Sequence, residues 1–294
     1  MGKTTSSTGL FPVVFASHGS PLMCSKESTS SKWWAEFGKK SLASGIKGVV
    51  YIGAHWEELG DRIRVATKFN PDKVQMDMVP RSFWGDYRIN ISQDLADRVI
   101  RLLQDEQFTD VQADPTFDWH DDTITPATWM FPDGTPPATV VSLNARYNPV
   151  FHVRIGMALA KLRSEGILIV GTGGAVHNLY RNNWVPMLSK GDNFQVGSTP
   201  AKWAIDFERA VSDVIKNNQG PALAGALVRL TRSPGYKAAH PTDDHFFPLL
   251  VAAGAASVGY DEGRLMAQTW ELQHMCNDQF LWGDWNVAPV GVKA

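Results

Sequence analysis

The chain has 294 residues, in which 28 lysines and arginines stand against 30 aspartates and glutamates, for a formal net charge of −2. Its apolar fraction of 44% and charged fraction of 20% are ordinary for a globular protein with a large core, which excludes a disordered chain. The near-zero net charge and the lack of a long basic run exclude the electrostatic signature of a nucleic-acid binder. We therefore expect a small-molecule partner and no nucleic-acid partner.

The first ten residues are polar and rich in serine and threonine, and we expect a flexible tail over 1–10 ahead of one domain over 11–294. The apolar run FPVVFA that follows is too short for the core of a signal peptide, and no stretch approaches the ~20 apolar residues of a membrane span. Cys24 and Cys276 lack any metal-binding spacing and are expected to be free thiols. These features predict a cytoplasmic protein with no membrane partner.

Short β-branched apolar runs alternate with amphipathic patterns along the chain. In chain order the patterns predict strands over 13–16 and 48–54, a helix over 92–104, a strand over 139–143, a helix over 148–164, a strand over 167–171, and helices over 200–217 and 246–256. The segments 70–87 and 182–197 lack a clear period and are expected to be long loops beside a pocket. This order predicts an α/β fold, a single domain with a central, mostly parallel sheet flanked by helices.

Four histidines lie where these apolar elements end or begin. His18 follows FPVVFAS, His55 follows GVVYIGA, His177 follows ILIVGTGGAV, and His245 precedes FFPLLVAAGA. In an open α/β sheet, the loops at the carboxyl ends of parallel strands converge on one crevice. Neutral imidazoles gathered there bind zinc or iron well. The sequence therefore predicts a mononuclear metal site at the carboxyl ends of the strands.

The segments around these histidines resemble a known family. SHGSP at 17–21, GAHW at 53–56, GTGGAVHN at 171–178 and HPTDDHFFPL at 240–249 are similar, in order and spacing, to the class III extradiol ring-cleavage dioxygenases. The resemblance runs from about Phe11 to the C-terminus and is strongest to the branch that contains DOPA 4,5-dioxygenase. It implies that the metal ligands are His18, His55 and His245, and that His177 is a catalytic acid and base that does not bind the metal.

The chain departs from the pattern of that family at two places. It reads Asp243-Asp244 where many relatives read Pro-Glu, and WHDD at 119–122 where many read Asp-His-Gly. Alignment on the following Phe-Pro-Asp places the family's middle histidine on Asp121, with His120 one position early. The candidates for substrate contact, or for hydrogen bonds to the ligand rings, are His120, Asp121, Asp244, His240 and Trp56. The alternatives are a solvated loop at His120 and a carboxylate ligand at Asp243, Asp244 or Glu57.

The resemblance implies an Fe(II) enzyme that opens a DOPA-like catechol with dioxygen to a product of the muconic semialdehyde type. Three protein ligands on one face of a ferrous ion leave positions for both reactants. Three neutral ligands leave the full dipositive charge on the metal, which favours loss of a catechol proton and makes Zn(II) an alternative occupant. A neutral His177 would take that proton and return one later.

Two other classes of protein remain compatible with these residues. One is a zinc-dependent hydrolase in the same pocket, with Asp121, Asp244 or His177 as the base that activates water. The other is a non-catalytic interaction protein on the same fold, since fold does not determine function. Each histidine taken alone also has an ordinary explanation, as a buried ring bonded to the backbone. The fold class is compatible with a homodimer.

Overall fold

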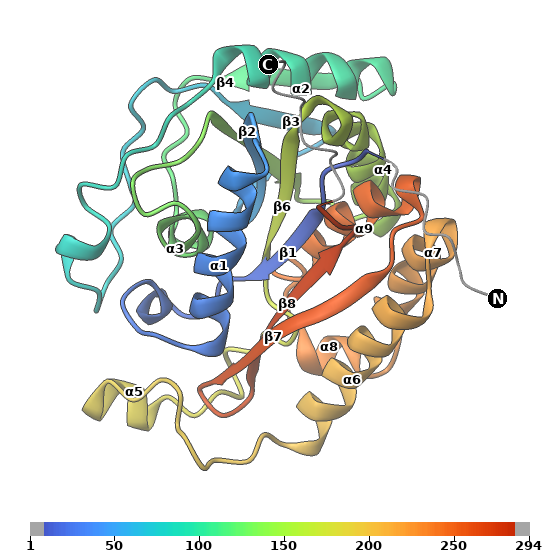
Figure 1. The fold of residues 1–294 in the computed structure, drawn as a ribbon. Coiled ribbons are helices and arrows are strands. Elements are labelled where there is room, and N and C mark those ends of the chain that lie inside the picture. Colours follow the sequence, from blue (N-terminus) through green and yellow to red (C-terminus); the bar gives the residue numbers. More distant parts are fainter. Residues whose placement is uncertain (1–8, 286–294) are drawn as a thin grey trace, which may run out of the picture.

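An eight-stranded sheet forms the centre of the fold, with the strand order β4-β3-β5-β2-β6-β1-β8-β7 (Figure 1). The computed structural model describes residues 9–285, so the tail expected over 1–10 lies almost entirely outside the described residues. The strands are β1 (Val13–Ser17), β2 (Gly48–Glu58), β3 (Arg62–Ala66), β4 (Asp110–Asp114), β5 (Ala138–Asn144), β6 (Ile167–Gly173), β7 (Gly263–Glu271) and β8 (Met275–Trp282). The four central strands β5, β2, β6 and β1 run parallel, which confirms the predicted sheet.

The strands that the sequence predicts are these same four central strands. They are almost wholly buried on both faces, so they read as continuous apolar runs. The four strands that the sequence did not predict lie outside them: β3 joins β5 antiparallel and carries β4, while β8 joins β1 antiparallel and carries β7. β4 is short and polar, and β8 buries polar residues, so neither shows the apolar pattern that identifies a central strand.

Helices cover both faces of the sheet and make a three-layer fold (Figure 1). They are α1 (Thr29–Ala43), α2 (Gln93–Asp105), α3 (Asp121–Met130), α4 (Pro149–Leu159), α5 (Val185–Lys190), α6 (Lys202–Asn217), α7 (Gly220–Leu230), α8 (Tyr236–Ala239) and α9 (Phe247–Gly259). α1 and α3 pack on the face that holds Val14 and Tyr51, and α2, α4, α6, α7 and α9 lie on the side of Val13 and Phe15. Neighbouring strand residues thus serve opposite cores, as the two-residue repeat of a strand requires.

The four helices predicted from the sequence are α2, α4, α6 and α9, with some differences at their ends. The expected helix over 148–164 is α-helical only to Leu159 and continues as a 3-10 helix to Glu165, where Gly166 takes a left-handed conformation (φ 91°). The expected loop over 182–197 contains the short helix α5. No helix among the described residues has the length and apolar character to cross a membrane. Cys24 and Cys276 are buried free thiols, as expected.

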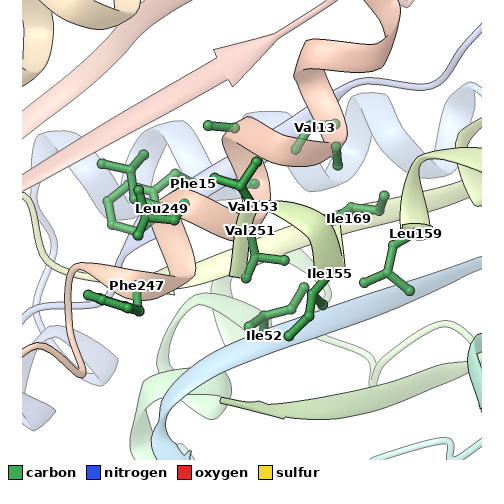
Figure 2. Packing of buried hydrophobic residues seen from close by; sticks show 14 of the residues in the cluster. Val13, Phe15, Ile52, Val153, Ile155, Leu159, Ile169, Phe247, Leu249 and Val251 are labelled. Carbon is green, nitrogen blue, oxygen red and sulfur yellow. The ribbon is translucent and has the colours of Figure 1, made fainter. Parts of the chain in front are cut away.

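The helices α4 and α9 touch backbone to backbone above the central strands. Figure 2 shows Val153 and Ile155 of α4 beside Val251 of α9, over Phe15 and Ile52 of the sheet. A Cβ on Gly254 would lie 2.2 Å from the carbonyl oxygen of Val153, and a Cβ on Gly156 would lie 1.9 Å from that of Val251. Only glycine therefore permits this approach of α4 to α9. The first turn of α9 is brought close to the sheet by two glycines of β6, since a Cβ on Gly171 would lie 2.5 Å from the carbonyl oxygen of Pro248 and one on Gly173 would lie 2.1 Å from that of His245.

Replacing Gly254 by alanine should lower the free energy of unfolding by about 1–3 kcal/mol, because the methyl group meets a backbone atom that has no room to move. The matched control is Gly225→Ala on α7, where a Cβ would meet only the flexible end of Arg229 at 3.4 Å. That control should gain stability, because alanine is favoured over glycine within a helix. Urea unfolding of both variants makes the test, and equal stability of Gly254→Ala and the unaltered protein would contradict the close contact.

Candidate metal centre

Three of the four histidines come from the carboxyl ends of neighbouring parallel strands. His18 follows β1 directly, His55 lies in the last part of β2, and His177 comes four residues after β6. His245 approaches from the turn before α9, and its carbonyl oxygen accepts a hydrogen bond from Gly174 N at 2.9 Å, just beyond β6. The structure thus brings all four to the one edge of the sheet that the sequence indicated.

A bulge in β2 turns His55 toward this edge. Ile52 pairs with Val141 of β5 and Glu57 with Leu143, so four residues of β2 lie opposite a single residue of β5. Bulges of this kind redirect side chains next to functional sites. The bulge is filled from α3 by Asp122, whose Oδ2 accepts a hydrogen bond from His55 N at 2.9 Å. Asp122 was not predicted as a site residue, because nothing in the local sequence pattern reveals that it contacts a distant strand.

The rings of His18, His55 and His245 surround one point. One nitrogen of each lies within 4.8 Å of those of the other two, and the ring centroids are 5.1–5.2 Å apart. His55 Nε2 and His245 Nε2 are separated by 3.2 Å. Two nitrogens bound to the same ion at about 2.1 Å lie roughly 3.0–3.4 Å apart in tetrahedral or octahedral geometry. The spacing therefore fits a mononuclear metal ion.

The surroundings of the three rings also fit a metal ion. His18 is 2% exposed, and its buried Nδ1 has no hydrogen-bond partner among the described residues. Burial, followed by the nearby rings of His245 and His55, holds the pKa of His18 well below its ordinary value. A buried, neutral imidazole without a complete set of hydrogen bonds is a suitable donor for zinc or iron. Among the described residues, one group of side chains has the spacing to hold a metal ion, and its three members are all histidines.

Carboxylates orient two of the three rings. Asp121 Oδ1 lies 2.7 Å from His55 Nδ1, and Asp244 Oδ2 lies 2.5 Å from His245 Nδ1. With Nδ1 donating to a carboxylate, each ring presents the lone pair of Nε2 to the common point. Burial lowers the pKa of His55, but Asp122 and Asp121 outweigh it and raise that pKa to about 9. The hydrogen bond to His55 keeps the pKa of Asp121 below its usual range although burial opposes this.

His177 lies against this group without joining it. Its ring is parallel to that of His245, with an interplanar angle of 6° and centroids 3.5 Å apart. Burial, and then the nearby rings of His245 and His240, hold the pKa of His177 well below its ordinary value. His177 is therefore a neutral ring, 9% exposed, that can accept a proton from a molecule bound beside it.

The other residues predicted for the site fall into two groups. His120 directly precedes α3, and its ring centroid is 6.3 Å from that of His55 and 5.4 Å from that of Phe117, which also stacks on Trp56. These rings form an aromatic wall beside His55. His240 is fully buried, and its Nε2 lies 3.0 Å from the carbonyl oxygen of Ala175, so it supports the backbone that leads to His177.

The carboxylates considered as alternative ligands make other contacts. Asp243 pairs with Lys237 at 2.8 Å, and Glu57 accepts a hydrogen bond from the hydroxyl of Tyr147. A pocket of about 410 Å³ opens beside the centre and is lined by Ala54, His55, Glu57, Tyr147, Thr242 and Asp244. Two carboxylates, Glu57 and Asp244, line this pocket together with His55, and its lining holds no lysine or arginine.

Comparison with known proteins gives the family. Residues 12–277 match the family model described as the catalytic LigB subunit of aromatic ring-opening dioxygenase. The chain belongs to this family. It is accordingly an extradiol ring-cleavage dioxygenase, an oxidoreductase, as the resemblance of its motifs implied, and it depends on a metal cofactor.

Individual relatives of this dioxygenase agree with the family match. The chain is 29% identical over 258 residues to 4,5-DOPA dioxygenase extradiol of Beta vulgaris, covering 87% of this chain and 91% of that protein. It is 29% identical over 254 residues to the protein of the same name from Escherichia coli (strain K12), covering 83% of this chain and 84% of that protein. The crystal structure of the uncharacterized protein JW3007 from Escherichia coli K12 matches with a TM-score of 0.74 at 24% identity. The match covers 93% of this chain and 100% of that chain. That likeness shows the shared fold.

Removing either ring-orienting carboxylate of this dioxygenase should weaken metal binding. Asp121→Ala and Asp244→Ala should each raise the metal dissociation constant by about 10–100-fold, because the imidazole loses the acceptor that fixes its tautomer and direction. Asp243→Ala is the matched control, since its carboxylate pairs with Lys237 instead of a ring. Competition with a chromophoric chelator measures all three variants. Unchanged affinity in both test variants would show that the rings are oriented by other contacts.

Proposed function

We propose that the chain is a non-haem Fe(II) enzyme that opens the ring of a DOPA-like catechol beside its two hydroxyls. Both atoms of O2 enter the product, which is of the muconic semialdehyde type. The observation that carries this proposal is the group of three histidine nitrogens within 4.8 Å of one another, with the neutral ring of His177 stacked on one member. We further propose residues 11–294 as the catalytic domain.

His18, His55 and His245 would hold the iron, each from a different segment of the chain. A ferrous ion bound there would offer positions to the catechol and to dioxygen and would mediate electron transfer between them. The chain contributes placement, since β1 and β6 are fixed by backbone hydrogen bonds in the sheet and the bulge of β2 is held by Asp122. His18 and His245 are buried, whereas the His55 side chain is 28% exposed and lines the pocket.

His177 moves the protons in this proposal. Its pKa lies well below its ordinary value, so the ring is neutral and able to accept a proton from a catechol hydroxyl as the substrate binds. The protonated ring is then unstable among the neighbouring histidines, and this favours return of the proton to the oxygen that leaves when the O–O bond breaks. The neutral ring keeps the lone pair that the first transfer needs, and its low basicity favours the second transfer, the return of the proton.

The pocket beside His55 supports a substrate with a positively charged side chain. Glu57 and Asp244 line it, and its lining holds no lysine or arginine. A DOPA-like catechol carries an ammonium group that such a lining attracts. His120, Trp56 and Phe117 provide flat apolar surface at the other side of the His55 ring, where an aromatic substrate can stack.

The remaining parts of the proposal concern the cell. We place the enzyme in the reducing cytoplasm, in keeping with its two buried free thiols. Its reactants are the catechol and O2, and we propose a homodimer as the assembly. Sedimentation of the purified protein tests the assembly without reference to activity.

Oxygen uptake by anaerobically Fe(II)-loaded protein, given DOPA and simple catechols, tests the reaction. The expected result is stoichiometric uptake with a new yellow product, and neither with Zn(II)-loaded protein. Uptake by no catechol despite full iron loading would overturn the proposal. Hydrolysis that depends on zinc and consumes no oxygen would support the hydrolase alternative.

His177→Ala should lower kcat by about 10²–10⁴-fold while iron content stays unchanged, because the variant loses proton transfer but no ligand. His274→Ala is the control, since this partly buried ring lies in the turn between β7 and β8 and accepts a hydrogen bond from Ala201 N. Steady-state oxygen uptake and metal analysis give both readouts. Retained activity would remove His177 from the mechanism, and lost iron would make it a ligand.

Glu57→Gln should raise KM for catechols with an ammonium side chain by about 2–5-fold, as expected for loss of one partly solvated charge pair. KM for the neutral 4-methylcatechol should not change. Glu58→Gln is the matched control, because Glu58 contacts Trp56 Nε1 and does not line the pocket. An equal change for charged and neutral substrates would show that the pocket does not receive the substrate side chain.

A further inference from the structure

His18 lacks the carboxylate partner that the other two rings of the metal centre possess. Asp121 orients His55 and Asp244 orients His245, but among the described residues no carboxylate hydrogen-bonds to either ring nitrogen of His18. A ring that no hydrogen bond holds directly must take its direction from the backbone and from packing. The direction of the His18 ring therefore depends on the loop that carries it.

That loop is fixed on both sides of His18. Before it, His18 N donates to the carbonyl oxygen of Gly173 at 3.0 Å, which extends the pairing of β1 with β6. After it, Ser20 donates twice to Glu271 at the end of β7, from its backbone N at 2.9 Å and from Oγ at 2.6 Å. Gly19 connects the two with φ +71°, and a Cβ there would lie 2.2 Å from Glu271 Oε2. The chain turns tightly around this carboxylate.

Glu271 is a carboxyl group built into the protein interior, where burial raises its pKa and its hydrogen bonds oppose that rise. It is 0% exposed, and besides Ser20 it accepts hydrogen bonds from the side-chain amides of Asn193 and Asn277, each at 2.6 Å. Each carboxylate oxygen thus receives two donors, and no lysine or arginine pairs with it within the described part of the chain. Burying a carboxylate costs free energy, and the four hydrogen bonds that Glu271 accepts offset this cost.

The same carboxylate reaches the segment that follows His177. Asn193 lies in that segment, and its own carbonyl oxygen accepts from Leu272 N at 2.7 Å. Asn183 N in turn donates to the carbonyl oxygen of Leu272 at 2.9 Å. Lys26 Nζ lies 3.0 Å from Asn193 Oδ1, which turns the amide nitrogen of Asn193 toward Glu271. Glu271 therefore joins the His18 loop to the stretch of chain beyond His177.

We propose that Glu271 is a positioning residue for the metal centre, which orients His18 through the loop 18–20 and couples that loop to the segment beyond His177. It does for His18, through the backbone, what Asp121 and Asp244 do for the other two rings directly. The inference rests on the proposed function in one respect, that His18 binds the metal. This position requires a side chain that accepts all four hydrogen bonds. A glutamine in place of Glu271 would point an amide N–H at one of the four donors.

The test is Co(II) binding to metal-free Glu271→Gln, followed by chelator competition and by the visible absorption spectrum of the bound cobalt. We expect at least a 10-fold weaker affinity and an altered spectrum, because the His18 nitrogen no longer points at the ion. Glu208→Gln is the matched control, as Glu208 is another buried carboxyl group but lies beside Asp278, whose side chain is on the opposite face of β8 from Asn277. A merely structural role would lower the melting temperature and leave the spectrum unchanged.

Unchanged cobalt affinity and spectrum in folded Glu271→Gln would overturn the inference. If that variant does not fold, Ser20→Ala removes one of the four donors and should shift the spectrum in the same direction by a smaller amount. An unshifted spectrum in this second variant would overturn the inference as well. Failure of the proposed function is seen separately, as cobalt binding by the unaltered protein that does not change on His18→Ala.

Discussion

Everything at this edge of the sheet depends on holding three imidazoles around one point. Their centroids are 5.1–5.2 Å apart, and His177 adds a fourth ring at 3.5 Å from His245. Protonated rings at these distances repel one another, so only His55, beside Asp121 and Asp122, has a raised pKa. The pKa of His18 and of His177 is accordingly lowered by burial and by the neighbouring rings.

The fold surrounds these rings with negative charge that faces away from the common point. Asp121 and Asp122 stand in the first turn of α3, where the helix dipole favours carboxylates, and Asp244 stands before α9. Each contacts a ring nitrogen or backbone N–H of the metal centre. If the three rings bind the proposed ion, three neutral ligands would leave it its full charge, and the carboxylates behind them would balance that charge without binding the ion themselves.

The segment 119–122, where the motifs of this chain depart from the resembled pattern, supplies an acceptor for the His55 ring. Asp121 accepts a hydrogen bond from His55 Nδ1, and His120 lies in the aromatic wall with Phe117. Glu271 serves the remaining ligand in the same way but through the loop of Ser20, which leaves the His18 ring free of any carboxylate contact.

The sequence by itself determined the four central strands, the helices α2, α4, α6 and α9 of one face, and the edge at which the histidines gather, but not α1 and α3 of the other face. It could do so because strands buried on both faces are continuous apolar runs, and the carboxyl ends of parallel strands share one edge. Only the tertiary structure decided the outer strands β3, β4, β7 and β8, the bulge of β2, and the partnerships of Asp122 with His55 and of Glu271 with Ser20. Such contacts join residues 67 and 251 positions apart, and no local pattern of polarity records which distant group a buried carboxylate will meet.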